Sequence, residues 1–305
     1  MGYVYMLVVL AAWTVIAFVY RWSERKQADR MVMSTAMGVA GTIWVSAYVF
    51  GSSVNIGHAH PSQWIIGTGL GFVAAAGIPL FLAAVARGDL SITWTVLTLS
   101  FAVAAVASII YPGERPTPLG VTGLVLAALA VAFLGLDMFV RHRSNGPGKP
   151  RKGWWLFMSL SFANNALSLY AYKLADALPK ASGHVPSAEQ AQSNTACFLL
   201  TMYGVFALAA LAASIVGGLR GKRGPGMGIG FVAGTLLCIG SFGFMFALGL
   251  RIPACLLYPI SNGGSSILVA VLSFVFLKER PGAFGWAGIA AGVASFVLLG
   301  LAMPR

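Results

Sequence analysis

The spacing of the charged residues limits the fold of this chain more than any other feature. Only 20 Lys or Arg and 8 Asp or Glu occur in 305 residues, and long uncharged windows separate them. A helix needs about 20 mainly apolar residues to cross the hydrocarbon core of a bilayer. Nine uncharged windows reach that length: 1–20, 31–86, 90–113, 116–136, 153–172, 190–219, 224–250, 252–277 and 281–304.

The windows predict an all-α integral membrane protein with ten transmembrane helices. Window 31–86 is too long for one span, and the polar segment 52–62 divides it into two. The apolar runs do not alternate in polarity as membrane strands do. We expect spans at 3–20, 31–51, 63–86, 90–112, 118–140, 153–175, 195–219, 227–250, 252–277 and 283–303.

The net charge of +12 suggests a nucleic-acid partner at first sight. With 58% hydrophobic residues, the chain has too few polar residues for a basic, water-soluble face. We therefore expect the lipid bilayer as a partner and no nucleic acid. Fifteen of the 20 Lys and Arg fall in the connections after the odd-numbered spans. The positive-inside rule then places both termini outside the cytoplasm.

The chain reads as two related halves. A basic linker, 141–152, separates a first five-helix repeat, 1–140, from a second, 153–305. Residues 90–136 align with 255–301, and both segments contain the tripeptide Glu-Arg-Pro. A tandem repeat of five spans reverses its direction across the membrane. We therefore predict two inverted repeats with a substrate site between them, as in many transporters.

Several motifs resemble the EamA-like branch of the drug/metabolite transporter superfamily. They are the Glu-Arg loop in each half, the glycines 285, 288 and 292 of the last span, and the segment 258–280. This resemblance implies ten helices, inverted five-helix repeats and a central cavity. It also implies cytoplasmic termini, opposite to the charge distribution. We expect a multi-pass protein of the bacterial cytoplasmic (inner) membrane, as a monomer or homodimer.

Polar residues inside spans mark functional sites, because hydrocarbon does not solvate them. The predicted substrate-binding residues are Trp13, Thr93, Trp94, Asn164, Asn165, Tyr172, Lys173, Arg251, Tyr258, Ser261 and Asn262. Each has a structural alternative. The asparagines can join helices by hydrogen bonds, Lys173 can extend to the interface beside Asp176, and Arg251 can be an interfacial anchor.

Two stretches in opposite halves predict interruptions of the helix. Tyr258-Pro259 precedes a Ser, Asn and Gly-rich segment, and proline removes a backbone hydrogen bond. The equivalent stretch 93–100 is rich in threonine and serine. We expect these paired interruptions to line the site.

We expect a secondary transporter of a small organic metabolite or drug-like solute. A flippase of a lipid-linked or amphipathic substrate is the alternative. An integral-membrane enzyme is disfavoured, because the spans hold no cluster of acid, base and nucleophile. His58 and His60 have no third ligand nearby, so we expect no metal, no cofactor and no catalytic residue. Gly230 and Gly234, four residues apart, predict close helix packing.

Overall fold

The computed structural model describes residues 2–87, 90–111, 113, 115–144, 152–181, 186–216, 226–277 and 282–302, and within these ranges the protein is helical and has no strand. The helices are α1 (Gly2–Arg25), α2 (Arg30–Gly51), α3 (Ser62–Val85), α4 (Leu90–Ile110), α5 (Pro118–Ser144), α6 (Trp154–Ala181), α7 (Ala188–Val216), α8 (Gly226–Gly249), α9 (Ala254–Tyr258), α10 (Gly264–Leu277) and α11 (Ala283–Leu301). Two short elements are the 3₁₀ turn η1 (Ile56–His58) and the π-helical turn η2 (Pro259–Gly263).

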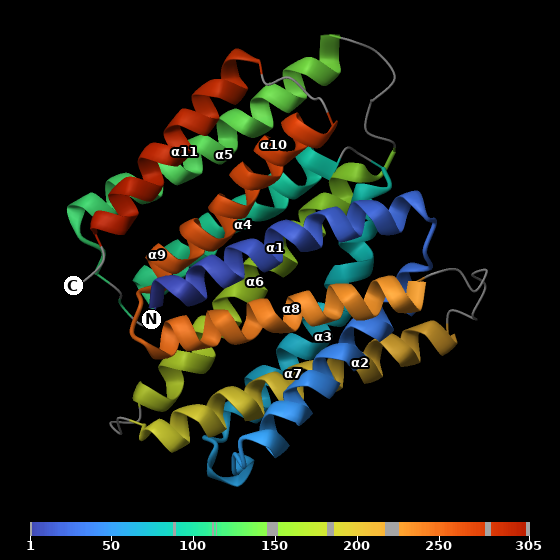
Figure 1. Ribbon diagram of the computed structural model, residues 1–305, viewed down its shortest axis with the longest axis vertical. Coiled ribbons are helices and arrows are strands. Elements are labelled where there is room, and N and C mark those ends of the chain that lie inside the picture. The colour runs from blue at the N-terminus through green and yellow to red at the C-terminus, as the bar shows by residue number, and fades with distance from the viewer. Residues whose placement is uncertain are drawn as a thin grey trace.

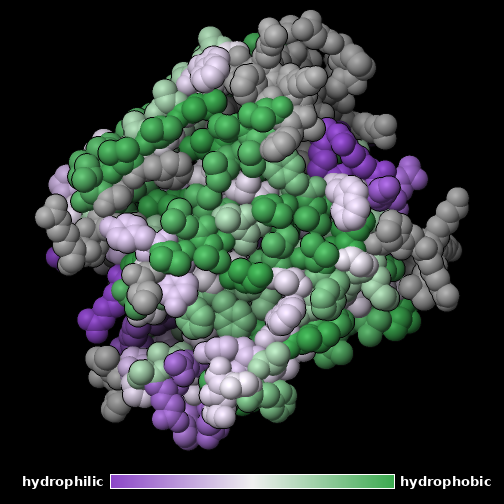
Figure 2. Space-filling model, in the orientation of Figure 1, coloured by the Kyte–Doolittle hydropathy of each residue, from purple (hydrophilic) through white to green (hydrophobic). Residues whose placement is uncertain are grey.

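The length and composition of the helices identify a multi-pass membrane protein. Among the described residues, eight helical runs are long and apolar enough to cross a bilayer: α1, α2, α3, α4, α5, α7, α8 and the run from α9 through α10. The apolar part of α11 is shorter, and α6 contains several polar residues. Figure 2 shows a hydrophobic face between hydrophilic groups at the two ends. The prediction of an all-α membrane protein is confirmed, and ten spans remain a prediction.

The helices form a bundle with a pair on each flank (Figure 1). On one flank α5 packs along α11, and on the other α2 packs against α7. Between them, α8 packs against α1 and α2, while α6 packs against α3 and α4. The run from α9 through α10 lies against α1 and α4. This inner group surrounds the centre of the bundle.

The two ends of the bundle differ in the connections they hold. Gly2 lies against Ile252, and Gly120 lies near Leu256 and Ala302. The first and last described residues therefore share one end, here called the terminal end (left in Figure 1). Connections after α1, α3 and α5 lie at the opposite end, here called the linker end.

Helices α6 and α7 extend beyond the predicted spans 153–175 and 195–219, and the connection between them is shorter than those spans implied. The helix α6 continues to Ala181, and α7 begins at Ala188. Lys180 Nζ lies 2.5 Å from Asp176 Oδ1, one turn away on α6. Ser187 Oγ accepts a hydrogen bond of 3.1 Å from a backbone N–H in the first turn of α7. Such pairs and caps continue a helix into water beyond its apolar part.

The basic linker predicted at 141–152 begins later in the structure than the sequence indicated. Helix α5 includes residues up to Ser144, so the first linker residues are helical. Residues 145–151 lie outside the described part of the chain. Glu114 and residues 278–281, which carry the Glu-Arg resemblance, also lie outside it.

One of the two predicted interruptions is present and the other is absent. Residues Pro259–Gly263 form a π-helical turn between α9 and α10, which confirms the first. Helix α4 is continuous from Leu90 to Ile110, so the second prediction was wrong. No proline lies within α4, and Thr98 Oγ1 donates to Thr95 O at 2.9 Å. Without a proline, no backbone N–H is missing from the ladder of α4.

Glycines on α8 allow the close packing that their spacing predicts. A Cβ at Gly234 would lie 2.4 Å from Met37 O of α2, and one at Gly230 would lie 2.5 Å from Met33 O. Both distances are far below van der Waals contact. The backbones of α2 and α8 therefore touch, as small-residue motifs allow in membranes.

We predict that Gly234→Ala lowers the free energy of unfolding by about 1–3 kcal/mol, because α2 and α8 must separate. The matched control is Gly228→Ala on the same helix, where an added Cβ meets nothing within 4 Å. Alanine there should be neutral or stabilise by about 0.5–1 kcal/mol. Thermal unfolding in detergent measures both variants, and equal midpoints would contradict the close contact.

Candidate functional site

A cavity of about 150 Å³ lies at the centre of the bundle. Helices α1, α3, α4, α6, α7 and α8 and the turn η2 form its walls, so both halves of the chain contribute. An engineered protein cavity of about 150 Å³ holds one benzene molecule. In this conformation the cavity therefore has room for a group the size of one aromatic ring.

All eleven predicted site residues lie in the described part of the chain, and six of them line this cavity. They are Trp13, Trp94, Asn164, Asn165, Tyr172 and Asn262. They come from α1, α4, α6 and η2, which are distant in sequence. Their role in substrate binding stays a prediction, but the fold brings them together.

Three of the remaining predicted residues are hydrogen-bonded within the helix packing. Thr93 Oγ1 accepts from Trp154 Nε1 at 3.2 Å. Tyr258 OH donates to Leu169 O at 2.8 Å, and Ser261 Oγ donates to Leu257 O at 2.6 Å. These hydroxyl groups hold helices in place and do not line the cavity.

Lys173 and Arg251, the two charged residues in the predicted site, line a different pocket at the terminal end. Lys173 Nζ lies 3.8 Å from Asp176 Oδ2. The central cavity has no Asp, Glu, Lys, Arg or His among its described lining residues. Its interior is therefore uncharged.

The two asparagines of α6 bridge helices at the wall of the cavity. Asn164 Nδ2 donates to Val73 O of α3 at 2.7 Å. Asn165 Nδ2 donates to Ser100 Oγ of α4 at 2.7 Å. Gly77 makes room for the first amide, since a Cβ there would lie 2.0 Å from Asn164 Oδ1. Their predicted bridging role is therefore present, and both side chains also face the cavity.

Two buried donors at the cavity have no hydrogen-bond partner among the described protein groups. They are Trp94 Nε1 and Asn262 Nδ2. Trp94 is 6% exposed and Asn262 is 4% exposed, so bulk water does not solvate them. A buried donor without a partner costs about 1–3 kcal/mol. A solute that presents acceptor atoms to these donors would recover that energy.

An aromatic cluster lies on the linker-end side of the cavity. It consists of Tyr20, Phe81 and Trp94, here called the linker-end triad. The ring of Phe81 lies 5.8 Å from that of Tyr20 and 5.7 Å from that of Trp94. The Tyr20 and Trp94 rings are 6.4 Å apart. These distances are typical of attractive aromatic pairs, so the three rings form one packed layer.

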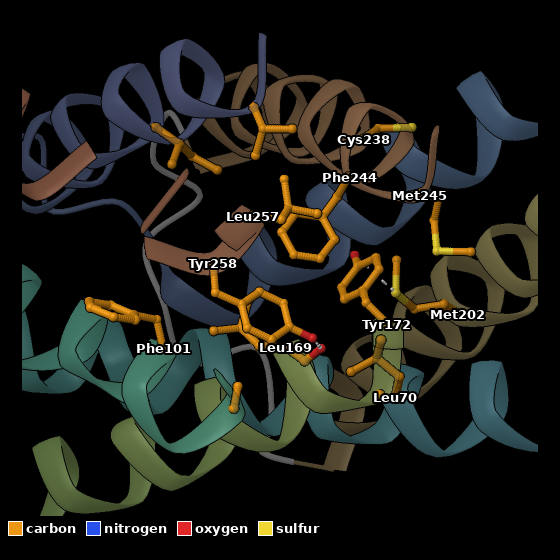
Figure 3. Packing of buried hydrophobic residues seen from close by; sticks show 14 of the residues in the cluster. Leu70, Phe101, Leu169, Tyr172, Met202, Cys238, Phe244, Met245, Leu257 and Tyr258 are labelled. Carbon is orange, nitrogen blue, oxygen red and sulfur yellow. Dashed lines mark hydrogen bonds between the residues drawn. The ribbon is translucent and has the colours of Figure 1, made fainter. Parts of the chain in front are cut away.

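A second aromatic cluster lies on the terminal-end side. Tyr172, Phe244 and Tyr258, here called the terminal-end triad, lie together in Figure 3. Phe244 stacks on Tyr258 with ring centroids 5.5 Å apart, and it lies 5.3 Å from Tyr172. Ser241 Oγ lies 2.7 Å from Tyr172 OH and 2.8 Å from Tyr203 OH, which fixes the two tyrosines. The cavity therefore lies between two aromatic layers.

Prediction from the sequence missed Tyr20, Phe81, Phe244 and Ser241. Apolar spans contain many phenylalanines and serines, and composition does not distinguish those at a cavity. One signal was available for Tyr20, because the alignment of the two halves pairs Tyr20-Arg21 with Tyr172-Lys173. Because Tyr172 was a predicted site residue, its equivalent Tyr20 in the other half could also have been predicted.

The histidine pair does not form a metal site in the described structure. His58 Nδ1 lies 3.4 Å from Glu189 Oε1, while His60 Nδ1 lies 2.8 Å from Ser62 Oγ. Across the described ranges, no group of three or more His, Cys, Asp or Glu side chains could hold a metal ion.

Comparison with known proteins supports the fold alone. No family model and no curated protein matches the chain. A crystal structure described only as that of a protein superposes with a TM-score of 0.70, covering 98% of this chain and 96% of the other. The identity is 16%, so this likeness concerns architecture and not activity.

Trp94→Phe should leave the protein as stable as before or raise its free energy of unfolding by up to about 1 kcal/mol, because the variant removes an unpaired buried donor and keeps an aromatic ring. The matched control is Trp154→Phe, which removes a donor that bonds Thr93. That change should cost about 1 kcal/mol or more. Chemical or thermal unfolding in detergent measures the change in the free energy of unfolding for each variant. Equal losses would mean that Trp94 Nε1 has a partner.

Proposed function

We propose that this protein is a secondary transporter that moves a small, uncharged organic solute through the central cavity by alternating access. The observation that carries the proposal is the cavity itself. It is uncharged along its described walls, holds two unpaired donors, and lies between two aromatic triads. A solute with a ring-sized apolar part and a carbonyl or hydroxyl oxygen fits this chemistry.

The packing of the helices supports two inverted five-helix repeats. An exchange of helices between the halves maps most packed pairs onto packed pairs. It pairs α1 with α6, α2 with α7, α3 with α8, α4 with the α9–α10 run, and α5 with α11. The contact of α1 with α8 becomes that of α6 with α3, and the contact of α2 with α8 becomes that of α7 with α3. The flank pairs map onto themselves. Such an exchange is expected of a duplicated fold.

The aromatic triads obey the same exchange. The members of the two triads lie on exchanged helices: Tyr20 on α1 and Tyr172 on α6, Phe81 on α3 and Phe244 on α8, and Trp94 on α4 and Tyr258 on α9. In an inverted repeat, a layer at one end has an equivalent at the other. We propose that each triad is a gate, and that the cavity opens toward one side when one triad separates and the other stays packed.

We further propose membership of the drug/metabolite transporter superfamily, in its EamA-like branch, and a place in the bacterial cytoplasmic membrane. Support comes from the paired Glu-Arg-Pro sequences and from the exchange of helices described above. The excess of Lys and Arg in the linker-end connections favours a cytoplasmic linker end.

A small solute suits the cavity better than the cargo of a flippase. A lipid-linked substrate needs space for acyl chains and an opening toward the bilayer. The cavity measures about 150 Å³, and aromatic layers lie on two of its sides. The size of this space is the reason for preferring a solute transporter.

The test is solute flux in proteoliposomes that contain the full chain. Uptake of a panel of uncharged aromatic and heteroaromatic metabolites is measured by mass spectrometry against protein-free vesicles. We expect saturable uptake of at least one compound. Absence of uptake and of exchange across the panel would refute the proposal.

For a transported compound, Trp94→Phe should raise KM about two- to tenfold, because a lost neutral hydrogen bond costs about 0.5–1.5 kcal/mol. The control is Trp64→Phe, an exposed tryptophan on α3 that does not line the cavity. An equal KM in both variants would show that Trp94 does not bind the solute, even if the protein transports it.

A further inference from the structure

A second pocket, of about 470 Å³, lies at the terminal end of the bundle. Three separate segments form it: α6 supplies Lys173, Asp176 and Lys180, the α4–α5 connection supplies Arg115, and the α8–α9 connection supplies Arg251. Tyr172, the neighbour of Lys173 in sequence, belongs to the terminal-end triad. The pocket therefore lies outside the central cavity, next to that aromatic layer.

Positive charge exceeds negative charge in this pocket. Four cationic side chains line it, and Asp176 is the one carboxylate among its described lining residues. Both lysines use that carboxylate, with Lys180 Nζ at 2.5 Å from Oδ1 and Lys173 Nζ at 3.8 Å from Oδ2. Lys173 is only 8% exposed, so one positive charge lies at the floor of the pocket. A net charge of this sign in a concave site attracts anions.

The pocket at the linker end provides a comparison. It is lined by Arg21, Arg25 and Arg30 with Glu24 and Asp29. Arg30 forms two hydrogen bonds to Glu24, at 3.0 and 3.2 Å, and Asp29 accepts from the first backbone N–H groups of α2. Its carboxylates therefore nearly balance its cations. Of these two pockets, the terminal-end pocket has the larger excess of positive charge.

The backbone of Arg251 supplies an independent observation. Its φ is +63°, in the left-handed region that favours glycine. Arg251 N donates to Leu248 O at 2.9 Å, and Ile252 N donates to Ala247 O at 3.3 Å. This pattern ends a helix with a left-handed residue that is usually glycine. Arginine is unfavourable in this backbone conformation, and its guanidinium lines the pocket. Strained residues of this kind occur mainly at functional sites.

We propose that the terminal-end pocket binds a phosphate monoester or an oxyanion of similar charge. Guanidinium groups bind such anions through two parallel hydrogen bonds, and ammonium groups add point charges. A soluble phosphate compound and the headgroup of an anionic lipid share this chemistry. The proposal does not rest on transport through the central cavity.

The experiment measures binding of inorganic phosphate to the full chain in neutral detergent, by calorimetry at constant ionic strength. Arg251→Gly and Arg115→Gln should each weaken binding at least about tenfold, because a hydrogen bond to a charged group is lost. Without ligand, Arg251→Gly should melt at the same temperature or higher, since glycine suits a positive φ. This second measurement shows that the variant is folded.

Two matched variants serve as controls. Ser53→Gly makes the same change at another left-handed residue, with φ +51°, after α2. Lys26→Gln removes one exposed positive charge at the linker end and lines neither pocket. Both should bind phosphate as the parent protein does. If all four variants bind with the parent affinity, or if the parent protein binds neither phosphate nor phosphatidate, the proposal is overturned.

Short-chain phosphatidic acid distinguishes the two sources of the anion. If phosphatidate binds more tightly than phosphate and depends on Arg251 and Arg115, the site takes a lipid headgroup. If phosphate binds at least as tightly with the same dependence, the site takes a soluble anion. Both results support the site. A binding assay in detergent needs no flux, so its failure is separate from a failure of the transport proposal.

Discussion

The need to hydrogen-bond every polar group inside hydrocarbon organises this molecule. A buried donor or acceptor without a partner costs several kcal/mol in lipid, so the long apolar segments of the described chain are helices. Some hydroxyl groups within spans bond to their own helix, as Thr98 does to Thr95, while other hydroxyl groups and amides cross to a neighbouring helix, as Tyr258 does to Leu169 and Asn164 does to Val73. Against this background, the two unpaired donors at the cavity, Trp94 Nε1 and Asn262 Nδ2, are informative exceptions.

Side-chain size decides where the bundle is tight and where it is open. On one side, Gly230 and Gly234 let α8 touch the backbone of α2. At the centre, the rings of the two triads keep the helices apart, and the cavity lies between them. Packing is therefore tight between α2 and α8 and looser at the centre of the bundle.

A good part of the fold could be predicted from local sequence. The uncharged windows locate the apolar helices, and Tyr258-Pro259 with the following glycines locates the turn η2. The predictions differ from the structure in the continuity of α4 and in the lengths of α6 and α7. Helix α4 stays continuous because it contains no proline, and α6 and α7 run past their apolar parts because an ion pair and a cap support their ends. The residues of the site were harder to predict, since Lys173 and Asn165 are both polar residues of α6 and yet line different pockets.

The sequence by itself determined which segments are apolar enough to enter a bilayer, because transfer into hydrocarbon depends mainly on the composition of each segment. It also predicted that the chain contains two related halves. Only the tertiary structure decided which polar residues face the cavity, since neighbours on a helix point about 100° apart and packing sets the rotation of each helix. The same holds for Asp137, which accepts a hydrogen bond of 3.0 Å from Gly282 N at the start of α11. The two residues are far apart in sequence, and only the packing of α5 against α11 brings them together.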